Sequence, residues 1–261
     1  MAEMLLTRRA AGCALVLAVA LCAVAAPLLS GYPPDGSSVE SLAPPSAVHR
    51  FGTDDLGRDV LARVLFGARV SLLIGPCAAL LATAIGLPLG LLGGFLRGLP
   101  ALVIVQLIDL CIALPGLVLA LFITVMVGPS LRNIILVLGV VMWPTMARLV
   151  RGQAMDVAVK PYVEAARATG CGTTRILVRH VWPNIMRTVA AQYATTVAFA
   201  IFTAASLSFL GLGIPPPTPD LGGMVRGGFQ FLTLNPMASL APGAVVGVMV
   251  SGFYLIGSSV D

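Results

Sequence analysis

The sequence predicts an all-α integral membrane protein with six transmembrane helices. Three observations support this fold class. Hydrophobic residues make up 58% of the 261-residue chain and charged residues only 10%, whereas an average soluble domain is about one-quarter charged. Six stretches are long and apolar enough to cross a bilayer. They are continuously apolar and do not alternate with polar residues, which indicates helices rather than the strands of a membrane barrel.

The first expected span follows two arginines near the N-terminus and resembles a secretory signal. Its apolar run, Ala10–Leu29, is 20 residues long, whereas the apolar region of a signal peptide usually has about 7–15 residues. We therefore interpret it as a retained helix, with a cleaved signal peptide as the alternative. Proline and glycine inside the spans are tolerated in membrane helices and can kink them. The six expected spans are residues 10–30, 69–96, 101–127, 132–150, 187–213 and 238–258.

The distribution of Lys and Arg predicts that both termini face the cytoplasm. With the N-terminus inside, the inner segments hold ten of the sixteen basic residues, while acidic residues gather in the outer segments. Residues 151–186 then form the largest cytoplasmic loop. This topology accounts for the net charge of +5, and the sequence has no basic, aromatic-rich pattern that indicates binding to nucleic acid.

Two segments are expected on the outer side of the membrane. Residues 31–68 begin rich in Pro, Gly and Ser and then become amphipathic, with Asp59 and Arg63 expected to pair at i, i+4. We predict an amphipathic helix that lies on the membrane before the second span. The other segment, GIPPPTPDLGGMV, is predicted to form a stiff turn. We therefore divide the chain into residues 1–68, with the first helix and this outer segment, and a core of five transmembrane helices, residues 69–261.

Motifs for catalysis and for nucleotide binding are absent from the sequence. A phosphate-binding loop needs a Gly-Lys pair, and the single lysine, Lys160, follows Val159. No GxSxG, HExxH or GxGxxG motif is present. Five cysteines and two widely separated histidines form neither a disulfide framework nor a metal-ligand spacing. The sequence therefore predicts a non-catalytic protein without a metal or cofactor of its own, and any ATPase must be another chain.

One polar segment interrupts the apolar sequence: EAARATGCGTTRILVRHVWPN, which begins at Glu164. Pro161 is suited to the first turn of a helix, whose positive end then carries Glu164. Gly170 is a typical helix stop, and residues 176–182 are expected to form a second helix that ends before Pro183. The sequence thus predicts a compact helix–turn–helix, although a solvated, positively charged loop is the simpler alternative.

The order of residues in this segment resembles the EAA loop of ABC-importer permeases: Glu-Ala-Ala, three residues, Gly170 and then Pro183. The similarity continues over nearly all of residues 48–225 and is to the C-type permease subunit of the dipeptide/oligopeptide/nickel branch. Two departures are His180 and Trp182, where the general EAA pattern has aliphatic residues, and a third is Leu221, where a Trp is typical. The segments that carry the resemblance are residues 51–72, 107–121, 143–153, 161–170, 179–184 and 207–223.

The resemblance implies the ABC type I importer permease fold, in the cytoplasmic membrane of a bacterium, with the EAA loop as a cytoplasmic coupling helix. It implies three kinds of partner besides membrane lipid: a homologous permease that completes a heterodimer, two ABC ATPase subunits that bind ATP and Mg²⁺, and an extracytoplasmic substrate-binding protein. The residues it assigns to coupling with the ATPases are Tyr162, Glu164, Ala165, Ala166, Gly170, Arg175, His180 and Pro183.

The branch implies di- or oligopeptides as the substrate, with nickel complexes or another small solute as alternatives. A secondary transporter that is driven by protons through Asp109, and a membrane scaffold that transports nothing, rank behind an ABC importer. Asp109 lies well inside an apolar run and is expected to pair with a neighbouring helix. Among the other candidates of the translocation path or gate, Pro115 is expected to shape its helix rather than touch substrate, and packing ranks ahead of a pore-lining role for Ser206 and Phe209. For the candidates of binding-protein contact, a solvated face is an equal alternative. The path candidates are Asp109, Pro115, Ser206 and Phe209, and the contact candidates are Asp54, Asp55, Arg58 and Asp59.

Overall fold

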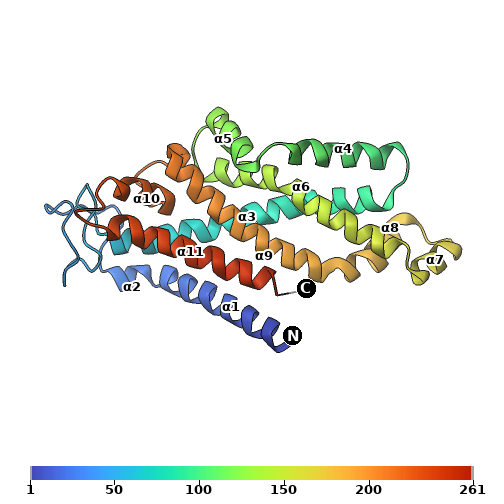
Figure 1. The fold of residues 1–261 in the computed structure, drawn as a ribbon, viewed down its shortest axis with the longest axis horizontal. Helices are drawn as coiled ribbons and strands as arrows, with labels where there is room; N and C mark the ends of the chain where they lie inside the picture. The colour runs from blue at the N-terminus through green and yellow to red at the C-terminus, as the bar shows by residue number, and fades with distance from the viewer. Residues whose placement is uncertain (1, 260–261) are drawn as a thin grey trace.

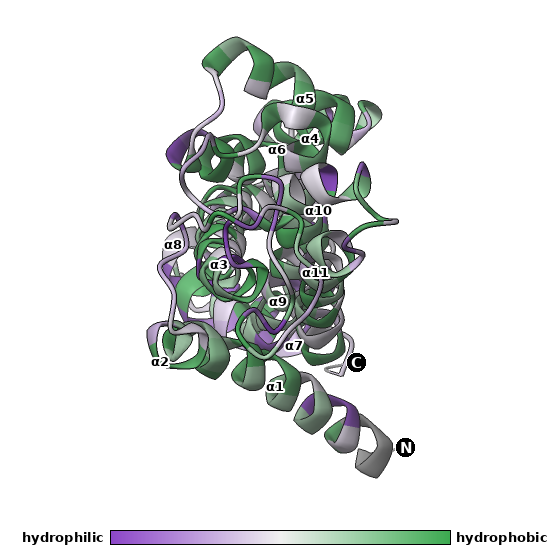
Figure 2. Cartoon of the chain, turned by 90° about the vertical axis from the view of Figure 1, so that its left-hand side faces the viewer, coloured by the Kyte–Doolittle hydropathy of each residue, from purple (hydrophilic) through white to green (hydrophobic). Residues whose placement is uncertain are grey.

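The computed structural model describes residues 2–259 as an elongated bundle of helices (Figure 1). Five helices are each long and apolar enough to cross a membrane, and a bent pair, α4 and α5, is a sixth candidate. Figure 2 shows that the helices are mainly hydrophobic and that the more hydrophilic residues gather in the loops. The described part of the chain contains no β-strand, only two isolated bridges. The helices run α1 (Ala2–Val24), α2 (Ala26–Ser30), α3 (Val60–Phe95), α4 (Leu99–Ala113), α5 (Gly116–Val127), α6 (Leu131–Ala158), α7 (Pro161–Ala168), α8 (Thr173–Ile176), a π-helical turn η1 (Leu177–Val181), α9 (Trp182–Leu207), a second π-helical turn η2 (Ser208–Leu212), α10 (Leu221–Phe229) and α11 (Met237–Gly257).

The third expected span, residues 101–127, is not one continuous helix. It is divided into α4 and α5, which meet at an angle of 86°. Pro115 stands at the break with φ −57° and ψ 120°, and Leu114 before it is extended, with ψ 134°. A proline disfavours the helical conformation of the residue before it, so the sequence Leu114-Pro115 ends α4 and α5 starts in a new direction.

The prediction of an amphipathic surface helix before the second span is also wrong. Residues 60–68 form the first turns of α3, which continues without interruption to Phe95. Val60 and Val64, whose side was expected to lie on the membrane, are 0% and 2% exposed and pack in a core cluster with residues of α9, α10 and α11. The division of the chain at residues 68 and 69 therefore falls within one helix.

The most extensive contact between two helices joins α3 and α6. Three glycines of α3, spaced four residues apart, lie against the backbone of α6: Gly86, Gly90 and Gly94. A Cβ added at any of them would lie 2.6 Å from a carbonyl oxygen of α6. Small residues at every fourth position allow membrane helices to approach closely, so this row of glycines fixes the central helix pair.

The two ends of the bundle carry different structures. Residues 31–59 and α10 cover one end, at the left of Figure 1, while α7 and α8 project from the other. Asn235, which is 0% exposed, holds the first end together because its Nδ2 donates to the carbonyls of Thr53 at 3.0 Å and Phe51 at 3.2 Å. The two candidate sites lie at these two ends.

Candidate functional site

The first candidate site is the α7–α8 end, and α7 is fixed to the bundle along one side only. Val163 is 0% exposed and belongs to a core cluster that includes Val150 of α6, Ile176 of α8 and Val181 of η1. Arg167 lies against the end of α3, with its guanidinium carbon 4.7 Å from the centroid of the Phe95 ring. The remaining surface of α7 faces away from the bundle, so this short helix is held firmly and still presents one side to a partner.

The end of α7 has the hydrogen bonds of a Schellman motif. Gly170 has φ +80°, its N–H donates to the carbonyl of Arg167 at 3.0 Å, and the N–H of Cys171 donates to that of Ala166 at 3.0 Å. Left-handed φ is costly for residues with a Cβ, which explains the glycine. A helix with Pro161 in its first turn and two turns over residues 162–169 was expected, and α7 covers Pro161–Ala168, so the helix and its stop at Gly170 are confirmed to within one residue at each end.

The second part of the expected helix–turn–helix differs from the structure. The helix does not end before Pro183, because α8 continues through the π-helical turn η1 directly into α9. Pro183 is the second residue after η1 and has no N–H to donate within this continuous helix, and the wider π-helical turn before it accommodates the proline. The polar segment is therefore joined rigidly to the fifth expected span instead of being separated from it.

Most charged side chains on this end have no ion-pair partner within residues 2–259. Glu164, Arg175 and Arg179 are exposed and form no ion pair with another described residue. The rings of Tyr162 and His180 lie 6.2 Å apart between α7 and η1. Of the eight residues predicted for coupling, Ala166 and His180 are half-buried, while the exposed ones are Tyr162, Glu164, Ala165, Gly170, Arg175 and Pro183.

The opposite end carries the four predicted binding-protein contacts, and three of them make contacts inside the chain. Asp54 binds Arg58 through Nε at 2.7 Å and also lies 3.5 Å from Nε of Arg63. Asp59 accepts from the N–H of Ala62 at 2.7 Å, which caps α3. Asp55 alone is exposed.

The expected Asp59–Arg63 pair does not form. The second oxygen of Asp59 lies 2.8 Å from Nδ1 of the buried His49, and Arg63 turns toward Asp54 and toward the carbonyl of Pro34, to which it donates at 2.9 Å. Both carboxylate oxygens of Asp59 therefore have partners, one in the cap of α3 and the other in His49, ten residues earlier in the sequence. The spacing i, i+4 describes neighbours within a helix, and Asp59 precedes the helix as its N-cap.

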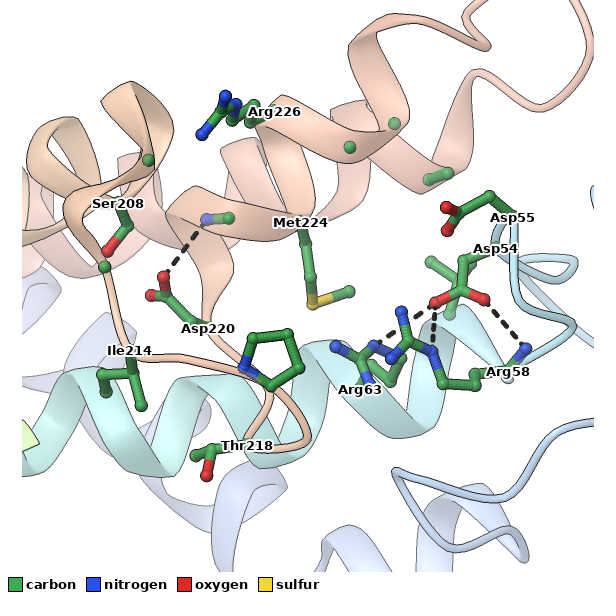
Figure 3. A pocket seen from close by; sticks show the side chains of 18 of the residues that line it. Asp54, Asp55, Arg58, Arg63, Ser208, Ile214, Thr218, Asp220, Met224 and Arg226 are labelled. Carbon is green, nitrogen blue, oxygen red and sulfur yellow. Dashed lines mark hydrogen bonds and ion pairs between the residues drawn. The ribbon is translucent and has the colours of Figure 1, made fainter. Parts of the chain in front are cut away.

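A pocket of about 380 Å³ lies at the same end, between residues 54–63, η2 and α10 (Figure 3). Asp220 caps α10 in its wall and accepts from the N–H of Gly223 at 3.3 Å. Burial raises the pKa of the Asp220 carboxyl above its ordinary value, and hydrogen bonds from Ser208 and from the backbone of Gly223 oppose that rise. The pocket therefore combines charged and apolar groups from segments that are far apart in the sequence.

Asp109 pairs with a neighbouring helix, which agrees with the expectation from the sequence. One of its oxygens accepts from Nη2 of Arg148 on α6 at 2.6 Å. Both side chains remain more than half exposed on the isolated chain, at 58% and 54%. An ion pair at this place on apolar helices avoids two isolated charges in the membrane. Arg148 was not recognised as the partner, because its position 39 residues along the chain gives no local signal.

The remaining two path candidates, Ser206 and Phe209, line a shallow apolar hollow of about 350 Å³ between α5, α9, α10 and α11. The hydroxyl of Ser206 donates to the carbonyl of Phe202 within the helix, at 2.8 Å, and Phe209 is 42% exposed. Within residues 2–259, no group of three or more His, Cys, Asp or Glu side chains is placed to hold a metal ion.

Comparison with known proteins defines the class of this helical bundle. The family described as "Binding-protein-dependent transport system inner membrane component" matches residues 86–260. The chain belongs to this family. A solved structure of the methionine ABC transporter MetNI in inward-facing conformations has the same fold, with a TM-score of 0.63 and 19% sequence identity over 75% of this chain and 93% of that one.

Two relatives show which branch of the family this chain resembles. The oligopeptide transport system permease protein OppC of Bacillus subtilis is 36% identical over 249 residues, which cover 94% of this chain and 81% of the relative. The dipeptide transport system permease protein DppC of Alkalihalophilus pseudofirmus is 36% identical over 248 residues, with the same coverage. The ABC type I permease fold and the resemblance to the peptide branch are thereby confirmed.

Proposed function

We propose that this chain is a permease subunit of an ATP-driven importer that carries di- and oligopeptides across the bacterial cytoplasmic membrane. The identity of 36% to permease proteins of oligopeptide and dipeptide transport systems, over 94% of the chain, supports the substrate class. The observation that carries the mechanism is the geometry of α7, which is anchored to the bundle through Val163. Glu164 of α7 and Arg175 of α8 are exposed and form no ion pair with another residue of the described range 2–259.

The α7–α8 end is the coupling element in this proposal. Two partner ATPase subunits bind ATP and Mg²⁺, and one of them holds α7 in a groove. Closure of the ATPases displaces α7, and because α8 and η1 continue directly into α9, the displacement is transmitted to a membrane span without a flexible hinge. This chain contributes no catalytic residue, and ATP hydrolysis belongs to its partners.

The other partners follow from the rest of the surface. The start of α1 and the end of α11 point toward the α7 end of the bundle (Figure 1), which supports an orientation with both termini in the cytoplasm. The end formed by residues 31–59 and α10 then receives the extracytoplasmic binding protein. A homologous permease completes the heterodimer, and substrate passes between the two subunits by alternating access.

The proton-driven alternative finds no support in the position of Asp109. Its carboxylate is held by Arg148 at 2.6 Å, whereas a proton carrier needs a carboxylate that exchanges protons during transport. The ion pair fits a structural role between α4 and α6, at a surface that a second protein subunit or a water-filled path covers.

The proposal is tested by purifying the chain with its partner permease and ATPases and reconstituting the assembly in liposomes. Binding protein that is loaded with a dipeptide is expected to stimulate ATP hydrolysis and to support ATP-dependent uptake of that peptide. The control is the same binding protein loaded with a nickel complex. Stimulation by the nickel complex and not by any peptide would contradict the substrate class. Uptake by this chain alone that is indifferent to ATP and abolished by an ionophore would contradict the whole proposal.

A further inference from the structure

The pocket at the end formed by residues 31–59 and α10 has the size of a ligand site. Its volume of about 380 Å³ lies within the range of about 300–1,000 Å³ that is usual for small-molecule pockets. Its walls come from residues 54–63, from η2 and the Pro-rich loop after it, and from α10 (Figure 3). Apolar side chains make up part of the wall, among them Val60, Ile214, Met224 and Phe231.

Four of the six charged side chains that line this pocket make contacts within the chain. Asp54 binds Arg58 at 2.7 Å and lies 3.5 Å from Arg63, so one carboxylate serves two guanidinium groups. Asp220 is buried, and its carboxylate is used to cap α10. These groups shape the pocket, and they leave little capacity for a ligand.

Two charged side chains on the wall remain available, and they have opposite signs. Asp55 and Arg226 are both exposed, and neither forms an ion pair with another residue of the described range 2–259. They come from separate elements, the segment before α3 and α10, and in Figure 3 Met224 lies between them. A ligand that satisfies both needs one cationic and one anionic end.

We propose that this pocket binds a short peptide as a zwitterion, with the α-ammonium group at Asp55 and the α-carboxylate at Arg226. This inference rests on the proposed function and adds a peptide site within this chain, outside the path between the two permeases. The guanidinium group binds a carboxylate with two parallel hydrogen bonds, and the apolar wall accommodates side chains of varied shape. Such a site would hold a peptide at the outer end before it enters the membrane.

Gly211 positions Arg226 for this role. It has φ +94°, and the place that a Cβ would occupy is taken by Nη1 of Arg226. Replacement of Gly211 by alanine therefore displaces the guanidinium group without removing its charge. The substitution also strains the backbone of η2, because a left-handed φ is costly for a residue with a Cβ, so G211A is a second variant that is compared with R226Q.

The test measures binding of radiolabelled dialanine, dialanine amide and N-acetyl-dialanine to the permease–ATPase assembly in nanodiscs, without the binding protein. The unmodified peptide is expected to bind the wild-type assembly, and R226Q is expected to weaken its binding about tenfold or more, as loss of a charge-assisted hydrogen-bond pair does. R226Q should leave the already weak binding of the amide unchanged. D55N should show the reverse selectivity, and G211A should resemble R226Q. Matched controls are R50Q and E40Q, which remove exposed charges of the same outer segment that do not line the pocket.

Three results would overturn the inference. The first is no saturable binding of dialanine by the wild-type assembly, and the second is an equal loss of binding of free and blocked peptides in R226Q. The third is an effect of R226Q and D55N only on the ATP hydrolysis that the unliganded binding protein stimulates. The last result would make the pocket a protein-docking surface. ATP-driven uptake of dialanine with binding protein present is measured in parallel. If the wild-type assembly takes up no peptide, the proposed function fails; if uptake is normal and the selectivity is absent, only the pocket assignment fails.

Discussion

Asp220 shows how a single buried carboxylate links the fold of the outer end to pH. Burial raises its pKa above the ordinary value of 3.8. A carboxyl whose pKa is higher in the folded than in the unfolded protein stabilises the fold fully below the unfolded value, and this contribution is lost as the pH rises through the folded value. The ionised form is therefore the less stable one here.

We expect Asp220→Asn to gain stability relative to the wild type as the pH is raised from below about 4 toward neutral. Asparagine accepts the same cap from the N–H of Gly223 and does not ionise. The measurement is the Tm of both proteins in detergent across this pH range, with the exposed Asp35→Asn as control. A Tm difference that is independent of pH, or one that grows in favour of the wild type, would contradict this assignment.

The ion-pair partners of polar residues could not be predicted from the local sequence. Asp109 was recognisable as an acid in an apolar run, and its pairing was expected, but the partner Arg148 depends on how α4 and α6 are rotated against each other. Asp59 has a favourable local partner at Arg63, yet it pairs with His49 because it caps α3. Tertiary packing decides both cases.

At the scale of the element, the turn after α7 contains two glycines whose backbone conformations differ. Gly170 has φ +80°, whereas Gly172 has φ −68°, and no atom lies within 4 Å of a Cβ added at either. Alanine at Gly170 therefore adds the backbone strain of a left-handed residue, about 1–2 kcal/mol, whereas alanine at Gly172 replaces the N-cap of α8 without that strain.

We expect Gly170→Ala to lower the amount of peptide taken up per ATP hydrolysed in liposomes, because the strained turn loosens α7 at its connection to α8. Gly172→Ala is the matched control and should behave like the wild type. Equal effects of the two substitutions would show that the left-handed turn has no part in coupling.

The helical segments could be predicted from the sequence, but the way in which one helix continues into the next could not. Pro161 and Gly170 mark the ends of α7 in the sequence, and α7 lies within one residue of the expected bounds at each end. Pro183 was expected to end the second helix, but a π-helical turn carries the chain past it into α9. The outer end of α3 was expected to lie on the membrane, but it is buried because α9, α10 and α11 cover it. The local sequence does not indicate these tertiary contacts.

The whole molecule is organised around the contact between α3 and α6. Gly90 lies where a Cβ would approach the carbonyl oxygen of Ala147 at 2.6 Å and Cβ of Val150 at 2.7 Å. We expect Gly90→Ala to destabilise the protein by about 1–3 kcal/mol, the usual cost of inserting atoms into a packed interior. Thermal unfolding in detergent measures this effect.

The control for Gly90→Ala is Gly247→Ala on α11, where no atom lies within 4 Å of an added Cβ. That substitution should leave Tm unchanged or raise it slightly, because alanine favours a helix over glycine. Similar losses at both positions would show that close packing of α3 on α6 does not limit the stability of the bundle.

The fold class and the family followed from hydropathy and from the EAA loop, since both signals are contiguous in the sequence. The pocket with Asp55 and Arg226 did not, because it joins segments about 170 residues apart. The hydropathy of residues 101–127 was uniform enough to suggest one span, and the 86° bend arises from the single dipeptide Leu114-Pro115.

The central claim is that α7 transmits ATP hydrolysis by partner chains to the membrane helices of this one. The most direct measurement is ATP-dependent peptide uptake, together with ATP hydrolysis, by liposomes that contain the full assembly with Glu164→Lys. The account predicts that the variant inserts and assembles, that ATP hydrolysis persists and that uptake is lost. Unchanged uptake by Glu164→Lys would contradict the account.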